Sequence, residues 1–267
     1  MAEMIWLVGY LALGAVAGFF AGLLGVGGGA ILVPVLALMF AAQGMPAEHV
    51  MHLALGTSMA AIIFTSLSSL YAHHRHGAVI WPIVKVITPG VVIGTFGGAQ
   101  LASLISTRPL AIFFAVFMSY VSFQMLVNIK PKPSRQLPGV LGMYAVGGGI
   151  GLISALVAIG GGSLSVPFMT WCNIKMHHAI GTSAAIGLPI AVAGTAGYML
   201  GGFRVTDLPA GSFGYIYLQA LAACVAMSML TAPLGAKAAH NLPVGTLKKI
   251  FAGVILLLVA KMVHGLL

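Results

Sequence analysis

One short pattern occurs twice in this chain. The copies are Val26-Gly27-Gly28-Gly29-Ala30-Ile31-Leu32-Val33-Pro34 and Ile159-Gly160-Gly161-Gly162-Ser163-Leu164-Ser165-Val166-Pro167. Glycine lets the backbone adopt φ > 0 and lets other groups approach its amide closely. A glycine run also weakens a helix by roughly 1 kcal/mol per residue relative to alanine. Each copy therefore predicts a break between two helical segments.

The composition of the chain places these breaks in a membrane. Apolar residues make up 60% of the 267 residues, and charged residues make up only 6%. Apolar runs of this length are typical of helices that span a bilayer. The N-terminal stretch has Glu3 but no basic region, so Met1–Leu24 is predicted to be a membrane segment and not a cleaved signal. The sequence thus predicts an all-α polytopic membrane protein.

Helices that are interrupted within a bilayer are typical of transport sites. Irregular backbone survives there only where protein or a water-lined cavity satisfies its polar groups. Breaks at corresponding positions of two halves are typical of the substrate sites of secondary transporters. The segment Ala30–Ala42 rises only roughly 20 Å as a helix, which is short of a hydrocarbon core of about 30 Å. We therefore predict that Ile5–Ala42 is a hairpin or a broken pair of helices.

Other features repeat together with the glycine pattern. Each triple glycine precedes an apolar segment that contains Gly-Thr-Ser, at Gly56-Thr57-Ser58 and at Gly181-Thr182-Ser183, with His52 and His177 at matching positions before them. We predict two homologous halves, residues 1–129 and 137–267, joined by a basic, proline-rich linker at residues 130–136. Each half is predicted to contain one glycine-broken hairpin and three spanning helices.

The predicted spanning helices are Val50–Ala72, Val79–Leu104 and Leu110–Asn128 in the first half, and Ala179–Leu200, Gly211–Ala239 and Leu247–Leu266 in the second. The second hairpin is predicted over Leu137–Cys172. The basic stretch His73-His74-Arg75-His76-Gly77 is predicted to be a loop.

The charges of the loops favour halves of inverted orientation. If the linker with Lys130, Lys132 and Arg135 is cytoplasmic, and each glycine segment is a hairpin, most other cations also fall inside, as the positive-inside rule requires. Those cations are Arg75, Lys175, Lys248 and Lys249, with Arg108 and Arg204 left outside. If each glycine segment crossed the membrane once, the halves would be parallel, and Lys175, Lys248, Lys249 and Arg108 would fall outside. The inverted arrangement also brings the two glycine tips from opposite faces to the midplane.

These motifs resemble those of a known family. The repeated Gly-Gly-Gly-x4-Pro segments, the Gly-Thr-Ser helices, and the stretches Leu234-Gly235-Ala236-Lys237 and Leu247–Phe251 are similar to the sulfite exporter TauE/SafE family of membrane permeases. The resemblance covers essentially the whole chain. It implies a secondary transporter of small anions, often sulfur-containing, such as sulfite, sulfonates, thiosulfate or related carboxylates, and it does not choose among them.

The residues themselves also suit an anion. The three acidic residues, Glu3, Glu48 and Asp207, fall at predicted ends or loops, which argues against a buried proton relay or a carboxylate cation site. The starts of the broken helices present free N–H groups and about half a positive charge. The predicted substrate-binding residues are Gly27, Gly28, Gly29, Ala30, Thr57, Ser58, Gly160, Gly161, Gly162, Ser163, Thr182 and Ser183. The alternative is that these small residues only permit close packing of helices.

Three further residues are candidates for ion coupling or anion contact. His52 and His177 are able to titrate near neutral pH, although such histidines are more often interfacial caps. Lys237 is placed either to contact an anion or to extend its amine to the membrane surface. The predicted partners are a small sulfur-containing anion, the lipid bilayer and a coupling ion, H⁺ or Na⁺, with no nucleic acid.

Other chemistry receives little support from the sequence. His73, His74 and His76 lack nearby acids or thiols for a metal site, and the glycines lack the Gly-x4-Gly-Lys-Ser/Thr pattern of nucleotide binding. No cofactor or metal is predicted, and the protein is predicted not to be an enzyme. The alternatives are a passive anion channel and, last, a membrane enzyme pairing Ser163 with His177 or His178. The predicted location is a bacterial-type cytoplasmic membrane.

Overall fold

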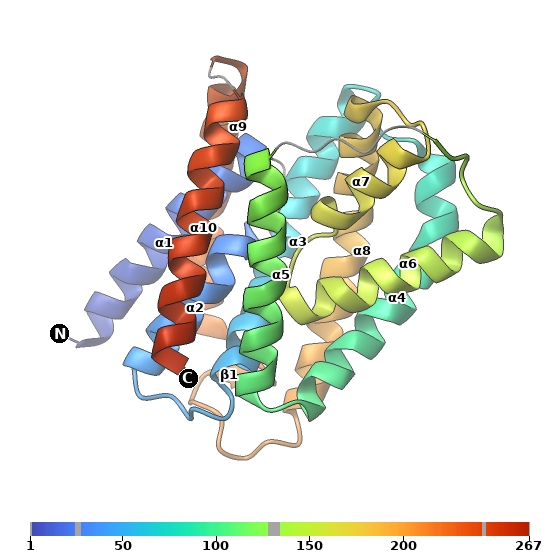
Figure 1. Cartoon of the computed structure of the whole chain (residues 1–267). Coiled ribbons are helices and arrows are strands. Elements are labelled where there is room, and N and C mark those ends of the chain that lie inside the picture. Colours follow the sequence, from blue (N-terminus) through green and yellow to red (C-terminus); the bar gives the residue numbers. More distant parts are fainter. Residues whose placement is uncertain (1, 25–27, 128–133, 242–243, 267) are drawn as a thin grey trace.

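The computed structural model describes residues 2–24, 28–127, 134–241 and 244–266, and these are almost entirely helical (Figure 1). The helices of the first half are α1 (Ala2–Leu24), α2 (Gly29–Ala42), α3 (Val50–Arg75), α4 (Trp81–Leu104) and α5 (Thr107–Val127). Those of the second half are α6 (Val140–Val157), α7 (Gly162–Trp171), α8 (Met176–Gly202), α9 (Leu218–Asn241) and α10 (Val244–Leu266). A short hairpin of β1 (Ser212–Phe213) and β2 (Ile216–Tyr217) precedes α9.

The outer surface of this bundle is suited to lipid. In the part of the chain that the structure describes, 7 helices are long and apolar enough to cross a membrane. Large apolar side chains such as Ile93, Val116 and Phe123 are exposed on that surface. Apolar patches of this extent are unfavourable in water and favourable in hydrocarbon. The prediction of an all-α polytopic membrane protein is confirmed.

Helices α3 and α8 form the centre of the bundle. In the most apolar part of α3, 78% of the residues are buried, and in α8 61% are buried, against 28% in α1. The two helices run antiparallel. Gly56, near the start of α3, lies against Tyr198, near the end of α8. Conversely, a ring nitrogen of His178, near the start of α8, lies 3.2 Å from the carbonyl oxygen of Ala78, which follows α3.

Two further helix pairs join the first and second parts of the chain in a reciprocal way. α1 packs most extensively against α9, and α4 packs most extensively against α6. The first helix of each half therefore packs against the fourth helix of the other half. Backbones approach closely at both pairs, because a Cβ atom on Gly22 would lie 2.0 Å from the carbonyl oxygen of Ala232, and one on Gly94 would lie 2.1 Å from that of Gly148.

Two predicted boundaries are wrong. His73, His74 and Arg75, predicted as a loop, form the last turn of α3, where the guanidinium of Arg75 complements the helix dipole. The helix ends only before Gly77, which has φ +65°. Residues 211–217, predicted as part of a span, form the β1–β2 hairpin instead. Gly211 and Gly214 adopt positive φ and provide its turns.

The predicted hairpin breaks are present as separate helices, α1 with α2 and α6 with α7. Gly27 and the linker residues Lys130 and Lys132 lie outside the described residues.

Candidate functional site

The two glycine motifs build the same turn twice. Gly28 precedes α2 with φ 70° and ψ −21°, and Gly161 precedes α7 with φ 77° and ψ −14°. The carbonyl oxygen of Gly28 accepts the N–H groups of residues 31 and 32, and that of Gly161 accepts those of residues 164 and 165. Left-handed φ values favour glycine over any residue with a Cβ atom. The sequence repeat is therefore also a repeat of backbone geometry.

Both turns leave the start of a helix uncapped by side chains. Neither Gly28 nor Gly161 offers a side chain to accept the first N–H groups of α2 or α7. These N–H groups belong to Gly29 and Ala30 in the first turn, and to Gly162 and Ser163 in the second. Each helix start therefore presents donors and the positive end of a helix dipole.

The structure brings the two turns together. A Cβ atom on Gly29 would lie 1.9 Å from the carbonyl oxygen of Ala158, the left-handed residue that ends α6. Ile62 of α3 lies beside both turns, because its side chain is close to Gly29 and to Gly160. The first turn thus packs directly against the start of the second.

A cavity of about 380 Å³ borders the second turn. Its walls come from α1, α3, α8 and α9, and Gly160 lies in its lining. The lining on α3 continues to His73, in the last turn of that helix, so the cavity opens toward the end of the molecule where α3 ends. Its serine and threonine hydroxyl groups belong to Thr65, Ser66, Ser68, Ser69 and Ser183, and the phenol of Tyr71 also lies in the lining.

Ser183 is the predicted hydroxyl residue that reaches this cavity. It is 3% exposed, and its Oγ lies 2.7 Å from the Oγ of Ser165, which in turn donates to the carbonyl oxygen of Gly161. Ser66, on α3, also lines the cavity and is 7% exposed. The hydroxyl of Ser66 has no hydrogen-bond partner among the residues that the structure describes.

The two predicted threonines lie elsewhere. Thr57 Oγ1 accepts the N–H of Tyr217, just before α9, at 2.9 Å, and Thr182 Oγ1 accepts the N–H of Ile80, just before α4, at 3.0 Å. Each threonine therefore fastens the start of the fourth helix of the other half. Ser58 is fully buried, outside the cavity lining, and its Oγ has no partner in the described part of the chain.

The two equivalent histidines have different surroundings. His52 is buried, with Nε2 at 3.0 Å from the carbonyl oxygen of Ala102 and 2.9 Å from that of Ile105, and its ring stacks on Tyr215. His177 is exposed and lies beside the ring of His178. Lys237 is exposed on α9, one helical turn beyond the cavity residue Pro233. None of the three lines the cavity.

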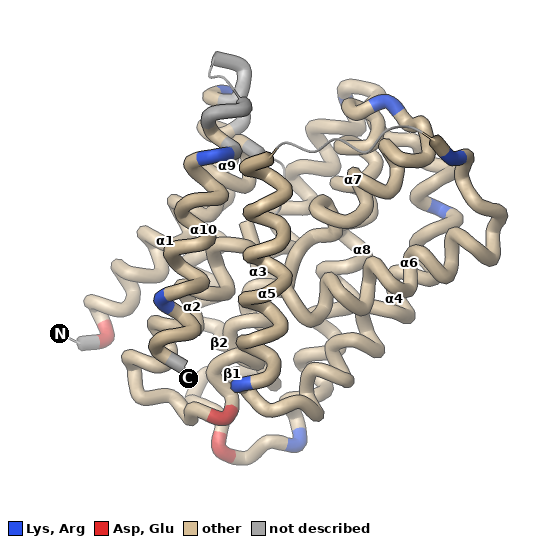
Figure 2. Tube along the Cα trace, viewed as in Figure 1, with Lys and Arg blue, Asp and Glu red and all other residues tan. Residues whose placement is uncertain are grey.

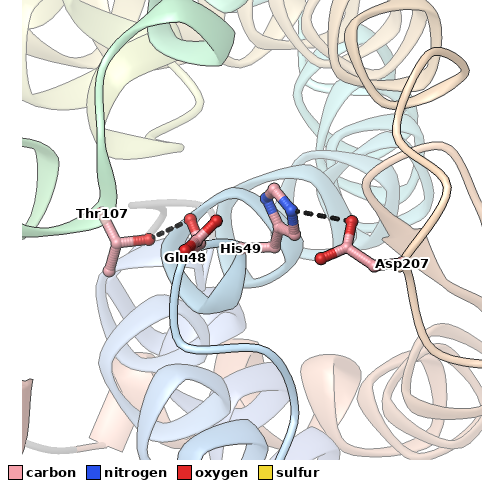
Figure 3. Close-up of polar contacts among 4 residues, drawn as sticks. All are labelled: Glu48, His49, Thr107 and Asp207. Carbon is pink, nitrogen blue, oxygen red and sulfur yellow. Dashed lines mark hydrogen bonds and ion pairs between the residues drawn. The ribbon is translucent and has the colours of Figure 1, made fainter.

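Polar contacts hold the opposite end of the molecule together (Figure 3). Nε2 of His49, before α3, lies 3.2 Å from a carboxylate oxygen of Asp207, in the loop after α8. The hydroxyl of Thr107, at the start of α5, donates to the carbonyl oxygen of Glu48. Burial, together with the nearby Asp207, raises the pKa of the Tyr215 phenol, which stays neutral here. These contacts tie the α2–α3 turn to both halves.

Charge is unevenly shared between the two ends (Figure 2). Most lysines and arginines lie toward the end where α9 ends, while Glu48 and Asp207 lie at the opposite end. At the basic end, the guanidinium of Arg135 lies 4.9 Å from the ring of Trp171. The cavity therefore opens toward the basic end.

The hydroxyl groups on α3 were missed by the sequence reasoning. The signal was the run Thr65-Ser66-Leu67-Ser68-Ser69, which interrupts an otherwise apolar span. Polar residues within a spanning helix are expected to face protein or a cavity.

The chain is similar in sequence to proteins named as probable membrane transporters. The family model described as "Sulfite exporter TauE/SafE" matches residues 10–262. The chain is 36% identical over 244 residues to a "Probable membrane transporter protein" of Haemophilus influenzae. This alignment covers 91% of this chain and 92% of that protein. It is 30% identical over 194 residues to the "Probable membrane transporter protein YdhB" of Bacillus subtilis, covering 70% of this chain and 76% of that protein. No solved structure matches the chain significantly. The chain is an integral membrane protein that belongs to the sulfite exporter TauE/SafE family of membrane transporters.

Proposed function

We propose that this protein is a secondary transporter of a small sulfur-containing anion and works by alternating access. The observation that carries the proposal is a cavity that ends at the second glycine turn and opens toward one end of the molecule. The other end is held by the His49–Asp207 and Thr107–Glu48 contacts. A cavity with access from one side only is what alternating access requires, whereas a passive channel needs a continuous path.

Inverted repeats would supply the moving parts. The antiparallel α3 and α8, the reciprocal pairs α1–α9 and α4–α6, and the matched turns at Gly28 and Gly161 all support this arrangement. In transporters built this way, one repeat rocks against the other around a fixed site. The repeats correspond to residues 1–129 and 137–267.

The substrate site would lie where the two glycine turns meet. The N–H groups at the starts of α2 and α7 suit an oxyanion, and the close approach of Gly29 to Ala158 joins the two turns into one site. The hydroxyl of Ser183 joins the second turn to the cavity.

The basic end would face the cytoplasm. Arg75, Lys175 and Arg135 lie at or beside the elements that meet there, and the positive-inside rule assigns such an end to the cytoplasmic side. The cavity then opens inward in this conformation. The relatives support a cytoplasmic membrane of bacterial type as the location.

Transport into proteoliposomes tests this function. Purified protein is reconstituted, and the uptake of sulfite, thiosulfate, methanesulfonate and acetate is followed against increasing substrate concentration. The proposal expects uptake of at least one sulfur-containing anion that saturates. Uptake that rises linearly without saturating would identify a channel, and no uptake of any sulfur-containing anion would contradict the proposal.

A further inference from the structure

We propose that the cavity beside the second glycine turn selects singly charged oxyanions and that Ser66 is the buried hydroxyl that donates to them. This inference rests on the proposed transport function and names the substrate class and a residue that determines specificity.

Ser66 is poised to bind an acceptor. It is 7% exposed, lies in the cavity lining, and its hydroxyl has no hydrogen-bond partner among the described residues. Because the residue lines the cavity, its hydroxyl is available to donate a hydrogen bond to an acceptor placed there. An oxyanion is the strongest acceptor for such a donor.

The neighbouring hydroxyl hydrogens are already used. A hydroxyl has only one hydrogen to donate. Thr65 donates its hydrogen to the carbonyl oxygen of Ile62. Ser165 donates to Gly161, so the short contact between Ser165 and Ser183 uses the hydrogen of Ser183. Ser68 and Ser69 lie nearer the mouth and are less buried. Ser66 is therefore the deep hydroxyl of the described lining that is free to donate.

The charge of the lining sets the charge of the ligand. The described lining contains no Lys, Arg, Asp or Glu, and its titratable side chains are Tyr71 and His73, both near the mouth. Removing an ion from water becomes far more unfavourable as its charge rises, and no buried cation is present to offset the loss for a dianion. Neutral hydroxyl and N–H donors are sufficient for a single negative charge.

The Ser66→Ala variant removes only the hydroxyl oxygen and keeps the Cβ atom. The equivalent position on α8 is Ala191, which is fully buried. Ser66→Ala therefore gives the first half the residue that the second half already carries. A methyl group added at Gly187 would reduce the space beside Ser66. Its Cβ atom would lie 2.8 Å from the carbonyl oxygen of Gly160 and 3.3 Å from Ser66 Oγ.

The experiment measures anion binding to purified protein by isothermal titration calorimetry. Methanesulfonate is the singly charged probe and sulfate the doubly charged one, at constant ionic strength. Calorimetry is preferred to thermal melting because sulfate stabilises folded proteins in general by being excluded from their surface. We expect saturable binding of methanesulfonate and none of sulfate. Ser66→Ala is expected to weaken methanesulfonate binding about tenfold, and Gly187→Ala at least as much.

Ser122→Ala is the matched control. Ser122 is a fully buried serine with an unpartnered hydroxyl in the described part of the chain, and it lies on α5 outside the cavity. Its replacement is expected to leave binding unchanged.

Three results would overturn the inference. Sulfate binding as tight as methanesulfonate, or unchanged affinity in Ser66→Ala, would remove the selectivity or the role of Ser66, and saturable uptake in proteoliposomes would still support transport. If neither probe binds and no sulfur-containing anion is taken up, the inference and the proposed function both fall.

Discussion

Gly28 and Gly161 both adopt a left-handed backbone conformation, and each begins a short helix, α2 or α7, at the place where the two glycine turns meet. A side chain at such a position strains the backbone by roughly 1–2 kcal/mol. Gly44 has almost the same conformation, φ +72°, in an exposed turn with no atom near its would-be Cβ. Comparing substitutions at Gly28 and Gly44 therefore separates the effect of backbone strain from the effect on function.

We predict that Gly28→Ala and Gly44→Ala lose similar stability, about 1 kcal/mol each, and that only Gly28→Ala loses transport. The reason is that relief of strain at Gly28 shifts the start of α2, whose N–H groups of residues 31 and 32 bind its carbonyl oxygen. Thermal unfolding in detergent and uptake into proteoliposomes measure the two effects. Equal loss of transport in both variants would mean that strain alone is responsible.

Thr57 and Thr182 test the competing interpretations of the Gly-Thr-Ser motif. We predict that Thr57→Val destabilises the protein by about 1–3 kcal/mol, because the buried N–H of Tyr217 loses its acceptor. Thr57→Ser keeps the hydroxyl and is expected to recover most of that stability. Anion affinity, measured by calorimetry, should stay within about twofold of wild type in both variants, since Thr57 lies outside the cavity lining. A weaker affinity with unchanged stability would instead assign Thr57 to substrate binding.

The helix pairs α1–α9 and α4–α6 depend on the absence of side chains where their backbones meet. We predict that Gly94→Ala destabilises the protein by about 1–3 kcal/mol, because its Cβ atom would lie 2.1 Å from the carbonyl oxygen of Gly148 and force α4 away from α6. Gly97, on the same helix, has no neighbour within 4 Å of a would-be Cβ atom. Gly97→Ala is therefore expected to be neutral or slightly stabilising. Thermal unfolding of both variants in detergent compares them, and equal stabilities would contradict close packing at this pair.

Most of the helices could be predicted from the sequence, because apolar runs of spanning length leave few alternatives. The boundaries at His73–Arg75 and at residues 211–217 could not. A basic stretch after an apolar run is compatible with either a loop or a last helical turn, and only packing decides between them. A hairpin as short as β1–β2 has no detectable alternation of polar and apolar residues.

The candidate site was only partly predictable for a related reason. The glycine turns carry a local signal, because left-handed φ values favour glycine. The role of a hydroxyl group depends on what lies opposite it. Thr57 and Thr182 match a motif next to the glycine turns, yet they face backbone N–H groups of the other half. Ser66 belongs to no repeated motif, and only the packing of α3 against α8 and α9 places it in the cavity.

The two ends of the bundle differ in how they are held. At the acidic end the His49–Asp207 pair is partly exposed, and such pairs contribute about 1 kcal/mol or less. We predict that Asp207→Asn opens this end more often and raises the labelling rate of a cysteine introduced at Ala102, which is buried beneath it, by up to about fivefold. Arg204→Gln, in the same loop, is the control and should not change the rate. Labelling that is insensitive to Asp207→Asn would show that this pair does not hold the end closed.

The two glycine turns share one backbone geometry, but the residues at matching positions around them differ in their hydroxyl groups. Ser66 on α3 corresponds to Ala191 on α8, and Ser165 on α7 corresponds to Leu32 on α2. If the halves exchange conformations during transport, the anion meets a different set of donors on each side of the membrane. The affinity on one side is then lower and the release there is faster. Transport is then kinetically asymmetric, because binding and release differ between the two sides, while the gradients of the anion and of any coupled ion set the direction of net transport.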